Sequence, residues 1–462
     1  MIILDRTIKK PLYAQIYEHI REEIKSGELK EGHRLSATRI QAENLGVSRN
    51  TVELAYLQLC SEGYLENKRG SGYYVKYVDT SLIDSDAVTK RLKDFHKERT
   101  AGRSYRYDMK YGNCHMEDFP MAKWRKATEK ALDEGGGSKL AVYGDSCGDM
   151  ELRSYLADYL ERTRGVTCGP DQIIIGGGTQ YLLSILVQLL RPGRCAIEEP
   201  GYDGVRSVLE NHQVEAVPVP VGQNGIDLSA LKEKNVDAVY VTPSHQFPLG
   251  AVMPIQTRME LLRMAQEKNF FLIEDDYDSI FRYGARSIPS MQGLDPGGKV
   301  IYMGSVSKAL APSLRLAYMV LPAELKNRYD MWFSEYHNTV SSVVQGALRI
   351  FMEEGGWERH IRKICLANKR KHDILVAELE KGLGDGFRIL GKGAGLHLII
   401  EAHFLTTEEM LVRIEQQGVK VYSMERYFAL GSKRNLVMAG FGGIRQADIG
   451  DAAARIVRAL SN

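Results

Sequence analysis

Short apolar runs that alternate with helical patterns, from about Tyr105 onward, constrain the fold of this chain more than any other feature. The clearest runs span residues 172–175, 195–197, 236–241, 270–273 and 299–303. Apolar strands separated by helices predict a mainly parallel sheet covered by helices, an α/β domain. Such sheets bind ligands at the C-terminal ends of their strands, so the polar residues that follow these runs are candidates for a site.

The length of 462 residues exceeds one ordinary core, and we expect at least two domains. We find no apolar stretch of the ~18 residues that a membrane span needs, and the first residues are charged, so we expect a cytoplasmic protein without a membrane partner. The 6 cysteines form no C-x-x-C pair, which predicts neither a metal site nor a disulfide framework. The net charge of +2 is a weak electrostatic signature for nucleic acid, so the placement of basic residues must carry that argument.

The first 78 residues have the pattern of a helix-turn-helix. Leu12, Ile16, Ile20 and Ile24 recur every four residues after a proline, as on one face of a helix. A second helix is expected over residues 38–45. Gly46 then makes a turn, and Ser48 caps a third helix that packs Val52, Ala55, Tyr56 and Leu59 inward.

This arrangement leaves the first turn of the third helix exposed, where side chains reach base edges in the major groove. The residues concerned are Ser48, Arg49, Asn50 and Thr51. Two β-rich runs follow, and the basic, glycine-rich link between them is typical of a wing laid along DNA; it contains Lys68, Arg69, Gly70 and Gly72. A plain three-helix bundle or a protein-docking module would share the helical pattern, and Arg39 and Arg49 would then be solvated surface charges.

The wing favours DNA binding, and five motifs closely resemble the winged domain of the GntR regulator family over about residues 10–77. They are Leu35–Arg39, Gly46–Val52, Ala55–Tyr56, Glu62–Tyr64 and Gly70–Gly72. The resemblance implies contacts to double-stranded DNA from Arg39, Ser48, Arg49, Thr51 and the wing around Gly70 and Gly72. The family commonly has Leu-Pro-Ser where this chain has Leu35-Ser36-Ala37, so the lead-in to the second helix is less rigid.

Residues 79–104 are rich in charge and poor in apolar side chains, which predicts a linker. A flexible chain of this length would span about 28 Å. Val88, Leu92 and Phe95 would alternatively form one face of a short helix. We therefore expect a winged helix-turn-helix domain over 1–78, a linker over 79–104 and an α/β domain over 105–462.

Three polar clusters follow strands of the α/β domain. Gly176–Gln180 opens a helix, and its free amides suit a phosphate, although a tight turn gives the same glycines. Glu274–Tyr277 places carboxylates at a strand end, where they would bind metal, cap a helix or face a ring nitrogen. Ser305–Lys308, with Arg315 nearby, sets a lysine among hydroxyls and a cation, where an amine loses its proton more easily.

Together these clusters resemble fold-type I aminotransferases over about residues 105–445, which use pyridoxal 5′-phosphate (PLP). The resemblance implies that Lys308 forms the Schiff base and that Asp275 holds the pyridinium proton. It assigns the phosphate to Gly178, Thr179, Ser305 and Arg315, with Ser307 beside them. Tyr202 would stack on the ring, and Tyr143 would reach the phosphate of the partner subunit.

The chain departs from the enzyme pattern near the cofactor's ring hydroxyl. Many aminotransferases have Asn-Pro-Thr-Gly where this chain has Phe247-Pro248-Leu249-Gly250. Phenylalanine makes no hydrogen bond, so His245, Gln246 or Tyr277 would have to compensate, and efficient transamination is in doubt while cofactor binding is not. Arg434 and Arg426 are candidates for the carboxylate of an effector.

A winged helix-turn-helix joined to an aminotransferase-like body is the layout of MocR-type regulators, and Thr242–Pro248 resembles that subfamily. The resemblance implies a homodimer in which each DNA-binding domain docks on the other subunit and reads paired half-sites. It also implies an amino-acid or amine effector that forms an external aldimine, or the cofactor itself as effector. We therefore expect a PLP-dependent transcription regulator; the alternatives are an active aminotransferase with a DNA-binding domain and a body that holds PLP without reacting.

Overall fold

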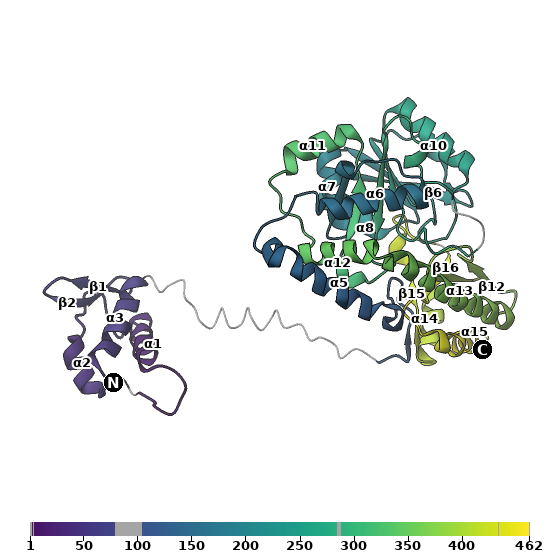
Figure 1. Ribbon diagram of the computed structural model, residues 1–462. Helices are drawn as coiled ribbons and strands as arrows, with labels where there is room; N and C mark the ends of the chain where they lie inside the picture. Colours follow the sequence, from purple (N-terminus) through teal and green to yellow (C-terminus); the bar gives the residue numbers. More distant parts are fainter. Residues whose placement is uncertain (1, 3, 79–103, 284–287, 433, 462) are drawn as a thin grey trace. The chain divides into compact units, whose positions relative to one another are not determined.

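The computed structural model describes residues 2, 4–78, 104–283, 288–432 and 434–461 (Figure 1). The chain divides into two compact units, Met1–Arg103 and Ser104–Asn462, called here the N-terminal and C-terminal units. The expected linker lies almost entirely outside the described residues. Within the described part, no helix combines the length and the apolar character that crossing a membrane would need.

The N-terminal unit has the expected helix-turn-helix followed by a hairpin. Its elements are α1 (Leu12–Lys25), α2 (Thr38–Leu45), α3 (Arg49–Ser61), β1 (Leu65–Lys68) and β2 (Gly72–Val75). Gly46 adopts a left-handed φ of 62° that ends α2, and the Ser48 hydroxyl accepts the Thr51 N–H at 3.2 Å to cap α3. The core of this unit includes Ile16, Ile20, Val52, Leu59 and Val75.

The C-terminal unit is built on a large sheet that confirms the α/β prediction. Within the described residues this sheet has 8 strands in the order β4-β11-β10-β9-β8-β5-β6-β7. The strands are β4 (Ile173–Gly176), β5 (Arg194–Glu199), β6 (Glu215–Gly222), β7 (Gly225–Ile226), β8 (Ala238–Val241), β9 (Phe271–Asp275), β10 (Val300–Ser305) and β11 (Ala317–Val320). Strands β6, β5, β8, β9 and β10 pair in parallel, and β11 pairs antiparallel with both neighbours.

Helices cover the large sheet, and a smaller antiparallel sheet follows it in the chain. The helices of this unit are α5 (Met121–Asp133), α6 (Met150–Arg164), α7 (Thr179–Leu190), α8 (Asp203–Asn211), α9 (Leu228–Lys232), α10 (Ile255–Lys268), α11 (Ala323–Phe333), α12 (Ser342–Glu353), α13 (Gly356–Gly382), α14 (Thr407–Gln416) and α15 (Ile449–Leu460). The smaller sheet has the order β12-β13-β16-β15. Its strands are β12 (Phe387–Leu390), β13 (His397–Ala402), β15 (Tyr422–Ser423) and β16 (Asn435–Gly440), while β14 (Val419–Lys420) pairs with β3 (Tyr107–Asp108).

The parallel strands of the large sheet place their carboxyl ends at one edge. Strands β5, β8, β9 and β10 are fully or largely buried along their length, since helices pack on both faces of the sheet. The polar residues that follow these strands therefore converge, as the sequence predicts.

Candidate cofactor site and DNA-binding face

The strand ends enclose a cavity of about 300 Å³ that brings the three predicted clusters together. It is lined by Tyr111, Gly112, Thr179, Gln180, Tyr202, Tyr240, Thr242, Phe247, Asp275, Tyr277, Ser305, Ser307, Lys308, Pro312 and Arg315. This volume and this mixture of aromatic and polar groups are typical of small-molecule sites.

Lys308 lies between two aromatic rings. Its Nζ is 4.0 Å from the ring centroid of Tyr111 and 3.9 Å from that of Tyr277, and it contacts the Tyr111 hydroxyl. Burial lowers the pKa of the Lys308 amine well below its ordinary value, because the charged form loses hydration. A neutral amine is a nucleophile, so this lysine is suited to imine chemistry with an aldehyde.

Asp275, at the end of β9, carries a carboxylate oxygen that needs a partner. The Tyr240 hydroxyl donates to Oδ2, whereas Oδ1 is buried without a hydrogen bond to any described residue. Burial raises the pKa of Asp275 to about 7, although the Tyr240 bond opposes this rise. A protonated ring nitrogen would supply the missing donor and hold the carboxylate ionised, which fits the pyridinium of PLP.

The opposite end of the cavity has the geometry of a phosphate site. Gly178 precedes α7 with φ 112° and ψ 165°, a conformation that glycine alone adopts readily, and a Cβ there would lie 2.3 Å from Nη2 of Arg315. The same Nη2 donates to the carbonyl of Gly177 at 3.2 Å. The guanidinium, the first amides of α7 and the Ser305 and Ser307 hydroxyls are donors that suit a phosphate.

The aromatic wall of the cavity is held by contacts on both sides. Tyr202 directly precedes α8 and meets Phe247 edge-on, with ring centroids 6.1 Å apart. The Tyr277 hydroxyl donates to the backbone carbonyl of His245 at 2.8 Å, and His245 Nδ1 lies 2.9 Å from Asp278 Oδ2. His245 is buried behind Tyr277 and does not line the cavity, whereas Phe247 does.

Tyr143, Arg434 and Arg426, which the sequence also singled out, lie away from the cavity lining. Tyr143 is 81% exposed and stacks on His337 at 4.1 Å. Arg434 forms a bidentate ion pair with Glu401 at 2.7 and 2.9 Å. Arg426 is ion-paired with Asp203, with Nε 2.7 Å from Oδ2.

The segment around Arg426 is tied to the large sheet by further hydrogen bonds. The Glu199 carboxylate at the end of β5 accepts the N–H groups of Ala429 and Leu430, each at 3.0 Å. The Gly201 N–H donates to the Tyr427 carbonyl at 3.0 Å. Residues 426–430, the connecting segment, thus join the smaller sheet to the strand end that precedes Tyr202.

Several cavity residues were not singled out in the sequence. Tyr111 and Gly112 come from the segment after β3, far along the chain from the three clusters, and no local motif marks them. Tyr240 lies inside an apolar strand, where a tyrosine is expected to be a core residue without a role in a site. In the β8–β9 register it pairs with Ile273, two residues before Asp275, so only the pairing of the two strands would reveal its role.

The expected DNA-binding residues lie on an exposed face of the N-terminal unit. The side chains of Arg39 and Arg49 are 83% and 66% exposed, and the ion pair of each is with a glutamate one turn further along its own helix. Asn50 is exposed beside them. Such ion pairs contribute little and exchange readily for phosphate.

The wing is a tight hairpin with basic residues at its tip. Lys68 pairs with Gly72 in the β1–β2 register, and Lys68 Nζ lies 4.9 Å from the Tyr74 ring centroid. Arg69 is exposed, and Gly70 and Gly72 adopt φ values of 78° and 112°. Arg34, which the sequence did not single out, pairs with Tyr74 and lies 3.4 Å from where a Cβ on Gly72 would be.

The comparisons with known proteins agree with both units. Residues 12–75 match the family of bacterial regulatory proteins, gntR family, and residues 108–435 match aminotransferase class I and II. The chain is 38% identical to the uncharacterized HTH-type transcriptional regulator YdeL of Bacillus subtilis, covering 96% of each chain. It is 34% identical to the probable rhizopine catabolism regulatory protein MocR of Rhizobium meliloti, covering 96% of this chain and 92% of that one.

Among solved structures, the chain is similar to LysN, the α-aminoadipate aminotransferase of Thermus thermophilus, in complex with N-(5′-phosphopyridoxyl)-L-leucine. The identity is 25% and the TM-score 0.68, over 77% of this chain and 92% of that chain. The aminotransferase fold and the donors that fit the ring and phosphate identify PLP as the cofactor of the C-terminal unit. The chain therefore belongs to the MocR-type regulators, in which a gntR-family helix-turn-helix precedes a class I and II aminotransferase domain.

Proposed function

We propose that this chain is a transcription regulator whose N-terminal unit binds DNA and whose C-terminal unit adjusts that binding in response to PLP, alone or with an amine. One observation carries the proposal: a chain with an exposed arginine in the first turn of α3 also places Lys308 in one cavity with an Asp275 whose Oδ1 has no partner among the described residues. The names of YdeL and MocR, both regulators similar over nearly the whole chain, support it.

In this proposal Lys308 would supply the amine that holds PLP, and Asp275 would hold the proton on the ring nitrogen. Thr179, Arg315 and the amides at the start of α7 hold the phosphate, with Ser305 and Ser307 beside them. When bound, PLP supplies an aldehyde that condenses with primary amines. Because burial lowers the pKa of Lys308, its side chain would present a neutral amine to such a group.

The effector, in our proposal, reaches the mouth of the cavity near the connecting segment. Arg426 and Arg434 are held by Asp203 and Glu401, so either would bind a carboxylate only by exchanging its partner. Exchange at Arg426 would loosen the connecting segment from α8, because Asp203 is the first residue of that helix. An effector with differential affinity for the tied and released states would shift their populations.

We further propose that two chains pair, with each DNA-binding domain, carried on the 79–104 linker, docked on the other subunit. The 81% exposure of Tyr143 suits a side chain that reaches the phosphate of a partner. Two N-terminal units on one dimer would read paired half-sites, as symmetric regulators commonly do. Arg39, Ser48, Arg49, Asn50 and Thr51 would face the major groove. The wing residues Lys68, Arg69, Gly70 and Gly72 would follow the backbone.

Aminotransferase activity is the second candidate function, since Lys308 and Asp275 are both in place. The position of Phe247 argues against efficient turnover, because phenylalanine donates no hydrogen bond and His245, which would have to compensate, lies behind Tyr277. Conversion of an amino donor and a keto acceptor over many turnovers at roughly 1 per second or faster would favour the enzyme.

The DNA proposal is tested by fluorescence anisotropy on DNA from upstream of the chain's own gene and on scrambled DNA. Arg49→Ala is expected to weaken specific binding by about 1–3 kcal/mol if the side chain reads a base. Lys68→Ala, if it contacts phosphate, should weaken both DNAs equally and reduce the salt slope. The proposal would be contradicted if the unmodified chain, Arg49→Ala and Lys68→Ala all bound both DNAs with equal affinity that did not depend on salt.

A further inference from the structure

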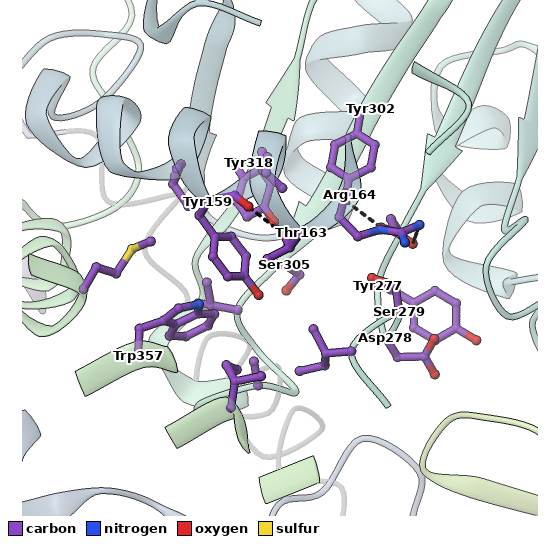
Figure 2. A pocket seen from close by; sticks show the side chains of 18 of the residues that line it. Tyr159, Thr163, Arg164, Tyr277, Asp278, Ser279, Tyr302, Ser305, Tyr318 and Trp357 are labelled. Atoms are coloured by element: carbon purple, nitrogen blue, oxygen red, sulfur yellow. Dashed lines mark hydrogen bonds and ion pairs between the residues drawn. The ribbon is translucent and has the colours of Figure 1, made fainter. Parts of the chain in front are cut away.

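A second cavity of about 290 Å³ lies beside the cofactor cavity in the C-terminal unit. Tyr277 and Ser305 line both cavities, whereas Lys308 lines only the cofactor cavity. The second cavity is bounded by α6, α12, α13 and the loop that follows β9. Figure 2 shows Tyr159 and Trp357 close together on one side, and Tyr277, Asp278 and Ser279 on the other.

Much of this lining is apolar. Leu156 and Leu160 contribute from α6, Val306 follows β10, and Met352 and Ile361 come from α12 and α13. The rings of Tyr159 and Trp357 meet edge-on with centroids 5.9 Å apart and extend this wall. An apolar group of moderate size on a ligand would be shielded from water by this wall.

Two charged side chains in the same lining have unsatisfied atoms. Asp278 is 2% exposed; its Oδ2 meets His245 Nδ1 at 2.9 Å, while Oδ1 has no hydrogen bond to any described residue. Arg282 has a buried Nη1 without a partner, and it forms no ion pair within the described part of the chain. Buried polar atoms are rarely left unpaired, since each costs free energy until a partner arrives.

Arg164 and Asp276, which line the same cavity, are by contrast paired with each other. Arg164 Nε donates to Asp276 Oδ2 at 2.6 Å, and the Tyr302 hydroxyl donates to the same carboxylate at 2.6 Å. Among the described residues the ion pair of Asp276 is with Arg164, and none joins it to Arg282. Burial and the nearby Arg164 both lower the pKa of Arg282, and Asp276 opposes this only in part.

We infer that this second cavity is a binding site for a free α-amino acid with an apolar side chain. Asp278 Oδ1 would accept from its ammonium, and Arg282 would donate to its carboxylate. The side chain would lie against the apolar wall formed by α6, α12 and α13. A simple anion or a simple amine would satisfy one of the two charged groups and leave the other unpaired.

The site would act on the cofactor cavity through the residues that the two share. Tyr277 packs against Lys308, and Ser305 accepts the Ser307 N–H at 3.1 Å on the phosphate side. A ligand that fixes these residues changes the affinity for PLP, and PLP changes the affinity for the ligand by the same factor. The inference does not require the proposed DNA response, because it concerns binding alone.

The test is isothermal titration of the full-length PLP-loaded protein with L-leucine, after borohydride has fixed the cofactor on its lysine. This treatment blocks amine exchange at Lys308, so any binding comes from elsewhere. We expect one site per chain with a dissociation constant below about 10 mM. Isocaproate, which lacks the ammonium, and isopentylamine, which lacks the carboxylate, should each bind at least about tenfold more weakly.

Two variants and one control locate the site. Arg282→Gln removes the carboxylate partner, and Ile361→Trp fills the cavity from the partly exposed side of α13; each should weaken leucine binding by about tenfold or more. Arg162→Gln, an exposed arginine on α6 paired with Glu358, should bind as the unmodified chain does. Absence of binding to the reduced protein, or binding that both Ile361→Trp and Arg282→Gln leave unchanged, would overturn the inference. If one variant fails to fold, the other decides.

Discussion

Replacement of Gly178 by alanine should damage the phosphate end of the cofactor cavity in two ways. The backbone at Gly178 has φ 112° and ψ 165°, where a residue with a Cβ is strained by about 1–3 kcal/mol. The new Cβ would also lie 2.3 Å from Arg315 Nη2, so the guanidinium must move away from the phosphate position. Loss of one charge-assisted hydrogen bond costs about 1.5–3 kcal/mol, so PLP affinity should fall by about 10- to 100-fold.

The assay is titration of the cofactor-free protein with PLP, followed by absorbance, with a thermal melt to report the strain. Gly169→Ala is the matched control, because Gly169 has a φ of −85° and nothing within 4 Å of its Cβ position. The control should keep the affinity and the melting temperature of the unmodified chain. Unchanged PLP affinity in Gly178→Ala would refute the assignment of Gly178 and Arg315 to the phosphate.

Three further predictions follow from individual contacts. Burial raises the pKa of Asp275 to about 7, so the folded cofactor-free protein keeps this proton at pH values where the unfolded chain has lost it. The contribution of Asp275 to the free energy of unfolding is therefore fully present at low pH and is lost as the pH rises through about 7. Asp275→Asn should therefore flatten the decline in unfolding free energy between about pH 5 and 7 by up to about 1.4 kcal/mol per pH unit, measured by urea titration; an unchanged slope would contradict it. Ser48→Ala removes the cap of α3 and should destabilise the N-terminal unit by about 1 kcal/mol in denaturant melts of that unit's signal, whereas Ser61→Ala, at the other end of α3, should not. Arg426→Ala should alter the response of the PLP absorbance band to added amino acids more than Arg434→Ala, because the Arg426 side chain is paired with Asp203 of α8, whereas that of Arg434 is paired with Glu401; the reverse order would favour Arg434 as the carboxylate group.

Much of the fold and of the cofactor cavity could be predicted from the sequence, because the informative residues are local to strand ends. Asp275 and Lys308 each come at or after an apolar run that predicts a buried strand, and parallel pairing brings such ends together. The helix-turn-helix could also be predicted from the sequence, since Gly46 marks the turn and Ser48 the helix cap, and the structure confirms both.

The remainder depends on contacts between distant segments. Tyr111 reaches Lys308 from the segment after β3, and no local pattern encodes that approach. The ion pairs of Arg434 with Glu401 and of Arg426 with Asp203 also join segments that are distant in the sequence. The sequence therefore did not indicate that the two arginines already have carboxylate partners. The antiparallel pairing of β11 was also missed, because an apolar run carries no information about strand direction.

The central claim is that occupancy of the cofactor cavity changes DNA binding. The most direct measurement is the anisotropy-derived Kd for the chain's own upstream DNA, at one fixed salt concentration, for cofactor-free protein, PLP-loaded protein and PLP-loaded protein with a panel of amines. We predict a change of about 5-fold or more between at least two of these states, and its loss in Lys308→Ala. The same Kd in all three states, with PLP demonstrably bound to Lys308, would contradict the claim and leave a DNA-binding protein whose cofactor domain serves another purpose.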